Sequence, residues 1–152
     1  MIKVLFVCTG NTCRSCMAEV IFNQSCNTDY MLAWSAGVSV FGESTASHNA
    51  VEVLKKHLGI DIGGRRAIQL TRNMIEDSYI VLTMTKSICD GLRSQFPDFE
   101  DKIFNLKEVI SQEGDVKDPF GGNIFNYETT YNELDYSISL LIGRLKEDTG
   151  IA

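Results

Sequence analysis

The sequence predicts a three-layer α/β fold, in which a four-stranded parallel sheet carries helices on both faces. Short apolar runs rich in β-branched residues alternate four times with segments of helical periodicity, a pattern typical of parallel sheets. The chain has 152 residues, enough to bury a core without disulfides or a structural metal ion. No linker, repeat or low-complexity segment divides it. We therefore expect a single domain spanning residues 1–152.

Four short apolar segments are the predicted strands. The first, IKVLFV, is apolar at nearly every position, as expected for a strand that is buried on both faces. YMLAWSA and YIVLTM have the same character, and a shorter segment follows near the middle of the chain. The predicted strands cover residues 2–7, 30–36, 79–84 and 102–106.

Five other segments are the predicted helices, and three of them (15–26, 45–58 and 124–147) have apolar side chains at helical spacing, so each of these three offers one face to the core. Gly59 is suited to end the second helix, Thr71 to cap the third, and Pro97 lies just beyond the fourth. The predicted helices cover residues 15–26, 45–58, 72–77, 86–95 and 124–147. The residues expected to face the core are Met17, Val20, Ile21, Gln24, Ala46, Ala50, Val53, Leu54, Leu58, Tyr131, Leu134, Tyr136, Ile138, Leu141 and Leu145.

Charge and composition limit the class of protein. The chain has 20 acidic and 14 basic residues and a net charge of −6, which disfavours a nucleic-acid partner because such surfaces are basic. The first apolar run is too short for a signal peptide, and no segment is long enough to span a membrane. We expect a cytoplasmic protein with no membrane partner. Thiols stay reduced there, so the clustered cysteines indicate catalysis or metal binding rather than disulfides.

Residues 8–15, CTGNTCRS, join the first predicted strand to the first predicted helix. Ligands of parallel α/β folds bind beyond the carboxyl ends of strands, and converging N–H groups at a helix N-terminus bind anions. Gly10 permits a tight turn, and Asn11 tolerates a left-handed conformation. The residues expected to contact a bound phosphate or other oxyanion are Thr9, Gly10, Asn11, Thr12, Cys13 and Ser15.

Cys8 and Arg14 give this loop its chemistry. The planar guanidinium of Arg14 matches two phosphate oxygens. Loop amides, the helix N-terminus and Arg14 together favour the thiolate form of Cys8, which is the nucleophilic form. Ser15 can donate a hydrogen bond to that thiolate and assist its later departure. The pattern predicts phosphoryl transfer to sulfur, followed by hydrolysis of the thiophosphate.

Such a mechanism needs a group that protonates the leaving group and then activates water. Asp118, in the segment DPFGG, is the candidate. Pro119 favours an extended conformation at Asp118, and the following glycines allow the loop to fold back over a site. Asp118 and Cys8 are far apart in the sequence, so their proximity is an expectation.

The motif C-x5-R-S after the first strand, SAG at residues 35–37 and the late DP dipeptide resemble the low-molecular-weight protein tyrosine phosphatase family over essentially the whole chain. The resemblance implies a flavodoxin-like sheet with strand order 2-1-3-4 and a phosphorylated protein as the substrate, without a cofactor or metal ion. It implies that Cys8 is the nucleophile, Arg14 the phosphate clamp and Asp118 the general acid and base.

The same resemblance assigns supporting roles. Ser15 is the implied hydrogen-bond partner of the thiolate, and Asn11 holds the shape of the loop with support from Ser35. Two positions depart from the family pattern. Cys16 replaces a proline that usually follows the R-S pair, which predicts a slightly looser start of the helix. Arg65 stands where many members have a loop-supporting histidine, so the usual supporting network is not assured.

Within the family, four segments are similar to the bacterial protein-arginine phosphatase branch. Tyrosine-directed members usually carry a larger aliphatic residue at the position of Thr12. A branched aliphatic side chain supports an aromatic ring, whereas the smaller, polar threonine suits a guanidinium group. Asp118 would then face a cationic substrate, and Phe120 would form an apolar wall. The segments are CTGNTCRS, TMT at 83–85, FNLKEV at 104–109 and GDVKDPFGG at 114–122.

Several alternatives accompany the phosphoarginine hypothesis. Phosphotyrosine is the alternative substrate, with the same residues in the same roles. An arsenate reductase would need relay cysteines in the second half of the chain, where only Cys89 is present, and a non-catalytic oxyanion-binding protein would need no nucleophile. Cys13 is either a buried packing residue or a reversible disulfide partner of Cys8. Cys16, Cys26 and Cys89 are interpreted as packing residues, and no zinc-ligand spacing is evident.

Overall fold

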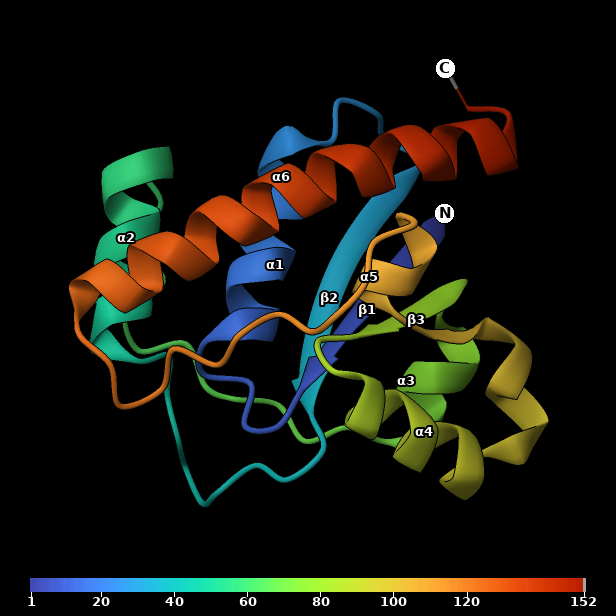
Figure 1. Cartoon of the computed structure of the whole chain (residues 1–152), viewed down its shortest axis with the longest axis horizontal. Coiled ribbons are helices and arrows are strands. Elements are labelled where there is room, and N and C mark those ends of the chain that lie inside the picture. The colour runs from blue at the N-terminus through green and yellow to red at the C-terminus, as the bar shows by residue number, and fades with distance from the viewer. Residues whose placement is uncertain (152) are drawn as a thin grey trace.

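The computed structural model describes residues 1–151 and has a parallel sheet at its centre (Figure 1). The four strands lie in the order β2-β1-β3-β4, which confirms the predicted fold class and strand order. β1 pairs with β2 on one side and with β3 on the other, and its side chains from Val4 to Cys8 are buried. The strands are β1 (Ile2–Cys8), β2 (Met31–Gly37), β3 (Ile80–Thr83) and β4 (Ile103–Asn105).

Helices cover both faces of the sheet. In Figure 1, α1, α2 and α6 lie on one side, and α3 and α4 lie on the other. Thr71 and Thr85 accept hydrogen bonds at the starts of α3 and α4, and Gly59 ends α2 in the left-handed conformation at φ 69°. The helices are α1 (Arg14–Ser25), α2 (His48–Leu58), α3 (Arg72–Asp77), α4 (Lys86–Gln95), the 3-10 helix η1 (Pro97–Lys102), α5 (Leu106–Val109) and α6 (Ile124–Thr149).

Most element boundaries lie within two residues of the prediction, and two larger differences stand out. α2 begins at His48 rather than at residue 45, because the preceding residues pair with another loop: Ala46 N donates to Arg65 O at 2.9 Å. The residues around β4 form the short helices η1 and α5, which the sequence did not indicate. They have six and four residues, which is too short to produce a periodic apolar pattern.

The core has two parts because successive side chains of β1 point to opposite faces of the sheet. Val4 and Phe6 pack with α1, α2 and α6, whereas Leu5 and Val7 pack with α3 and α4. Burial of a side chain of this size stabilises the fold by about 1.5–3 kcal/mol. The alternating side chains of β1 therefore pack against both helical layers.

Two of the predicted core residues are wrong. Tyr136 is 60% exposed, because the buried stripe of α6 follows Leu134, Ile138 and Leu141 at spacings of three and four residues. Gln24 is also exposed, since it lies in the last turn of α1, beyond the edge of the buried face that contains Ile21. Val20 is partly buried against the core.

The loop after β1 is held by the end of β2. Val38 N donates to Cys8 O at 3.0 Å, and Ser39 N donates to Thr9 O at 2.9 Å, so the chain continues past β2 alongside the loop. Gly37 allows this approach: a Cβ atom there would lie 2.7 Å from Thr9 O. The SAG segment therefore brings the first loop and the second strand into backbone contact.

Across residues 1–151, no helix combines the length and the apolar character that a membrane crossing requires.

Candidate active site

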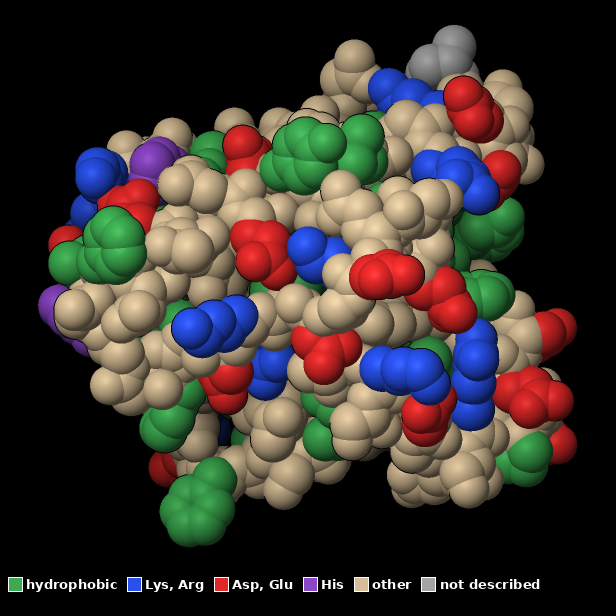
Figure 2. Space-filling view, viewed as in Figure 1, with side chains coloured by type: hydrophobic (Ala, Val, Ile, Leu, Met, Phe, Trp, Pro, Cys, Tyr) green, Lys and Arg blue, Asp and Glu red, His purple; other side chains and the backbone are tan. Residues whose placement is uncertain are grey.

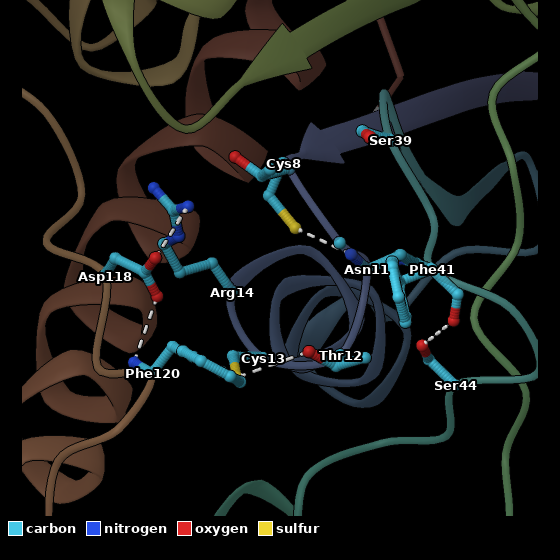
Figure 3. Close-up of a pocket in the computed structure, with 12 residues that line it drawn as sticks. Cys8, Asn11, Thr12, Cys13, Arg14, Ser39, Phe41, Ser44, Asp118 and Phe120 are labelled. Atoms are coloured by element: carbon cyan, nitrogen blue, oxygen red, sulfur yellow. Dashed lines mark hydrogen bonds and ion pairs between the residues drawn. The ribbon is translucent and has the colours of Figure 1, made fainter.

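A pocket of about 380 Å³ opens at the carboxyl ends of β1 and β2. It contains every predicted residue of the loop from Cys8 to Arg14, together with Asp118 and Phe120, which come from much later in the chain (Figure 3). The lining residues are Cys8, Thr9, Gly10, Asn11, Thr12, Cys13, Arg14, Ser39, Phe41, Ser44, Asp118 and Phe120.

The backbone of the loop has the features of an anion site. Asn11 adopts a positive φ of 58°, which turns the chain tightly between β1 and α1. α1 starts at Arg14, and its N-cap Cys13 makes no side-chain hydrogen bond to the first turn. The first N–H groups of a helix lack partners within the helix, so an oxyanion at this position would satisfy them and meet the positive end of the helix dipole.

Cys8 lies at the base of this loop. Its side chain is 3% exposed, and Sγ lies 2.8 Å from Ser15 Oγ. Asn11 N also donates to Cys8 Sγ at 3.3 Å. Both groups are able to donate to a thiolate, so the geometry suits the ionised sulfur that the sequence predicts. Ser15 does not line the pocket; it is fully buried behind Cys8.

Asn11 is fixed by four hydrogen bonds. Its Oδ1 accepts from Ile68 N at 2.9 Å and from Arg65 Nη1 at 3.1 Å. Its Nδ2 donates to Ser15 Oγ at 2.7 Å and to Ser35 Oγ at 3.0 Å. These bonds use the full capacity of the amide and determine its orientation. Ser35 therefore contacts the amide of Asn11. The network that the sequence left in doubt is present, with Arg65 as a member.

Arg14 and Asp118 meet on one side of the pocket. Arg14 is 5% exposed, and its Nη1 donates to Val116 O at 3.3 Å. Its Nη2 lies 3.5 Å from Asp118 Oδ2, and the Asp118 side chain is 52% exposed. Asp118 Oδ1 accepts from Phe120 N at 3.0 Å. The carboxylate is thus oriented and also accessible to water, as a general acid and base requires.

Aromatic side chains stand at the mouth of the pocket. Figure 3 shows Phe120 beside Asp118 and Phe41 on the opposite side, and these two rings are 74% and 90% exposed. Figure 2 shows exposed hydrophobic groups scattered among intermixed acidic and basic side chains on one face of the molecule. Phe41, Ser39 and Ser44 also line the pocket, and none of them was predicted. An aromatic residue in a loop directly after a strand was the only available signal.

The other thiols near the loop are enclosed. Cys13 Sγ lies 3.3 Å from Tyr127 Oη and 3.4 Å from Ser47 Oγ. Burial, followed by the hydrogen bond with Cys13, raises the pKa of Tyr127 to about 12. Burial also raises the pKa of the Cys16 thiol, so it stays protonated at neutral pH and is a poor nucleophile. Cys16 Sγ donates to Cys13 O at 3.3 Å, within the first turn of α1.

Comparisons with known proteins agree with this geometry. Residues 3–150 match the family described as low molecular weight phosphotyrosine protein phosphatase. A protein-arginine-phosphatase of Bacillus subtilis is 39% identical over 149 residues, which cover 95% of this chain and 97% of that protein.

Two solved structures extend the comparison. A low molecular weight protein tyrosine phosphatase from T. tengcongensis has 46% identity and a TM-score of 0.89, and the match covers 95% of this chain and 99% of that chain. A variant of the arginine phosphatase YwlE with a phosphorylated active-site serine has 37% identity and a TM-score of 0.90, with 97% of each chain covered. This chain therefore belongs to the low molecular weight phosphotyrosine protein phosphatase family.

Proposed function

We propose that this cysteine-based protein phosphatase removes phosphate from phosphoarginine residues of proteins. The observation that carries the proposal is Thr12, which is partly buried in the wall of the pocket. Threonine presents a hydroxyl group where a branched aliphatic residue presents only methyl groups. A hydroxyl oxygen accepts a hydrogen bond from a guanidinium N–H, whereas a methyl group packs better against the face of a phenol ring.

In the first step, the Cys8 thiolate attacks phosphorus. The S–P bond forms as the P–N bond to the guanidino nitrogen breaks, and Asp118 donates its proton to that nitrogen. Arg14 and the loop amides bind the non-bridging oxygens, where negative charge is concentrated. Asp118 is within reach of that nitrogen because its carboxyl group borders the pocket and lies 3.5 Å from Arg14, the residue proposed to bind the phosphate.

In the second step, Asp118 takes a proton from water, and the water oxygen attacks phosphorus. The S–P bond breaks, inorganic phosphate is released, and Cys8 returns as a thiolate. Ser15 Oγ, 2.8 Å from Cys8 Sγ, supports the proposal by offering a donor to the departing sulfur. The phosphorylated serine in the related YwlE variant is consistent with a phosphoenzyme intermediate.

Phosphotyrosine is the second candidate substrate. It is favoured by the T. tengcongensis relative, which is 46% identical and is described as a tyrosine phosphatase. The Bacillus subtilis arginine phosphatase, at 39% identity, favours phosphoarginine. Overall similarity does not separate the two, so the proposal depends on the residues that line the pocket, Thr12 above all.

The decisive experiment compares turnover of two peptides that differ only in carrying phosphoarginine or phosphotyrosine. We expect a higher kcat/KM for phosphoarginine. A strong preference for phosphotyrosine would overturn the proposal. A generic aryl phosphate does not distinguish the two, because both classes of enzyme cleave it.

Two substitutions of Thr12 test the pocket wall. Thr12→Ile should shift the ratio of the two kcat/KM values toward phosphotyrosine by about tenfold or more, a typical effect of added methyl groups in a pocket. Thr12→Val keeps the shape but removes the hydroxyl, so it should lower phosphoarginine turnover while leaving aryl phosphate turnover close to wild type. Unchanged ratios in both variants would remove Thr12 from the explanation of specificity.

A further inference from the structure

A second cavity, of about 440 Å³, adjoins the candidate active site. Asp118 and Phe120 line both this cavity and the active-site pocket, so the two share a wall. We call the second cavity the flanking groove. It is lined by residues 117–122 and, on α6, by Phe125, Asn126, Thr129, Thr130 and Glu133.

Hydrogen bonds hold both sides of the flanking groove in place. In Figure 1 the segment before α6 passes along the first half of that helix and then turns into it. Thr130 Oγ1 donates to Lys117 O at 3.4 Å, which attaches the segment to the helix, and Gly122 N donates to Pro119 O at 2.8 Å, which closes a turn. Because these contacts exist without a partner, a ligand entering the groove need not order the backbone, a cost that otherwise weakens binding.

Two phenylalanine rings give the flanking groove its apolar character. Phe120 is 74% exposed and Phe125 is 71% exposed. Aromatic side chains contribute a large apolar area to an interface and lose little conformational freedom when they are covered. Exposed apolar groups that cluster at a cavity, rather than scatter singly, indicate a binding surface.

The charges of the flanking groove disfavour a basic ligand. Two carboxylates line it, and each is paired with a cation from outside the groove: Asp118 Oδ2 lies 3.5 Å from Arg14 Nη2, and Glu133 Oε1 lies 3.3 Å from Lys107 Nζ. The remaining charged side chain of the lining is Lys117. A lysine or arginine of a partner would therefore meet carboxylates that are already paired, and an uncharged, apolar side chain fits the groove better.

We propose that the flanking groove binds the stretch of the substrate protein next to the phosphorylated residue and accommodates one aliphatic side chain against Phe120 and Phe125. The argument rests on continuity, because a residue whose phosphorylated side chain enters the active-site pocket has its neighbours at the shared wall. An extended chain advances about 3.3 Å per residue, so three residues cover about 10 Å. The proposal deepens the proposed function and rests on it, since it requires a protein substrate.

The first experiment measures kcat/KM for two series of peptides, one carrying phosphoarginine and the other phosphotyrosine. Within each series, glycine, leucine or lysine is placed in turn at each of the three positions on either side of the phosphorylated residue. We expect leucine at one of these positions to raise kcat/KM about fivefold over glycine, a fraction of the effect of burying a leucine fully. Equal values for leucine and glycine at all positions, or a preference for lysine, would overturn the proposal.

Substitutions of Phe125 then locate the preference in the flanking groove. The readout is the leucine-to-glycine ratio within each variant, from which any general change in turnover cancels. Phe125 does not line the active-site pocket. Phe125→Ala should bring the ratio close to one, and Phe125→Leu should keep most of the wild-type preference because it remains apolar. A wild-type ratio in Phe125→Ala would overturn the proposal.

Phe125→Asp covers the case in which removal of the ring disturbs the fold. Phe125 is the second residue of α6, where a carboxylate is favoured by the helix dipole, so this variant should remain folded. It replaces an apolar group of the groove by a negative charge. The preference for leucine should disappear and lysine should become the better neighbour, whereas an unchanged preference for leucine would overturn the proposal.

Tyr136→Ala is the matched control. Tyr136 lies on the same helix and is 60% exposed, but it does not line the flanking groove. This variant should keep the wild-type ratio, and a loss of the preference as large as that of Phe125→Ala would overturn the proposal by showing an effect unrelated to the groove. Sedimentation of the wild-type protein and of Phe125→Ala tests another occupant. A wild-type dimer that Phe125→Ala dissociates would assign the groove to a second copy of the chain and overturn the proposal.

The proposed function and the role of the flanking groove fail in different ways. If phosphotyrosine peptides are strongly preferred over phosphoarginine peptides, the proposed function fails, and the ratio within the phosphotyrosine series still decides the role of the groove. If phosphoarginine peptides are preferred and the neighbouring residue has no influence, only the role of the groove is overturned. Cleavage of neither series would overturn both.

Discussion

The phosphate-binding loop and the mouth of the pocket are built in opposite ways. Residues 8–15 are largely buried, and the amide of Asn11 has all its hydrogen-bonding capacity satisfied. The mouth, formed by Phe41, Asp118 and Phe120, is at least half exposed at each of these side chains. The buried loop can hold an oxyanion and the sulfur in fixed positions, and it includes Thr12, the proposed selector between phosphoarginine and phosphotyrosine. The exposed mouth supplies Asp118 and leaves two aromatic side chains free to contact the rest of a protein substrate.

The largest expected effect comes from the interior. Cys8→Ser removes the thiolate and should lower turnover of any phosphorylated substrate on the order of 10³-fold or more, because a serine hydroxyl without a paired base is a weak nucleophile. Steady-state kinetics and isothermal titration with inorganic phosphate measure turnover and binding separately. We expect phosphate binding to persist. Full activity in this variant would mean that Cys8 is not the nucleophile, and a wild-type protein that binds phosphate without turnover would be an oxyanion-binding module.

Gly37→Ala should have an intermediate effect on stability and activity, because Gly37 packs against the phosphate-binding loop. The new Cβ would lie 2.7 Å from Thr9 O and 2.9 Å from Gly10 C, both backbone atoms that cannot move without deforming the loop. We expect the free energy of unfolding to fall by about 1–3 kcal/mol, and kcat/KM to fall with it.

Gly91→Ala in α4 is the control for this change, since nothing lies within 4 Å of its Cβ position. It should raise stability by about 0.5–1 kcal/mol, because alanine favours helix more than glycine does. Urea denaturation and aryl phosphate kinetics measure both variants. Equal behaviour of the two would show that contact between β2 and the loop is unimportant.

The smallest effect on the fold is expected at the mouth. Phe41→Ala removes a ring that is 90% exposed, so stability should change by less than about 0.5 kcal/mol. Turnover of an aryl phosphate should stay near wild type, whereas KM for a phosphorylated protein should rise several-fold, roughly the effect of losing one exposed aromatic contact. Tyr136→Ala is the control, because it removes a ring that is 60% exposed on α6, away from the pocket. It should leave stability, aryl phosphate turnover and KM for the phosphorylated protein unchanged. Equal KM values in the two variants would argue against a separate role for the mouth.

Much of the fold was predictable because local pattern and tertiary environment agree. The alternation of apolar runs and amphipathic segments gave the four strands and the longer helices, and Thr71 and Gly59 cap helices as their chemistry predicts. The prediction that Tyr136 faces the core was wrong, because its position on α6 lies outside the stripe of buried residues. The predicted start of α2 was too early, because the backbone hydrogen bond between Ala46 and Arg65 competes with helix formation.

Local sequence alone brings Cys8, Arg14 and Ser15 together, because all three lie in one short segment where a strand leads into a helix. Packing of distant segments places Asp118 beside Arg14, brings Phe41 to the pocket and joins Arg65 to Asn11. These contacts link residues that are tens of positions apart. No local pattern encodes them, since they arise where separate loops converge at the carboxyl edge of a parallel sheet.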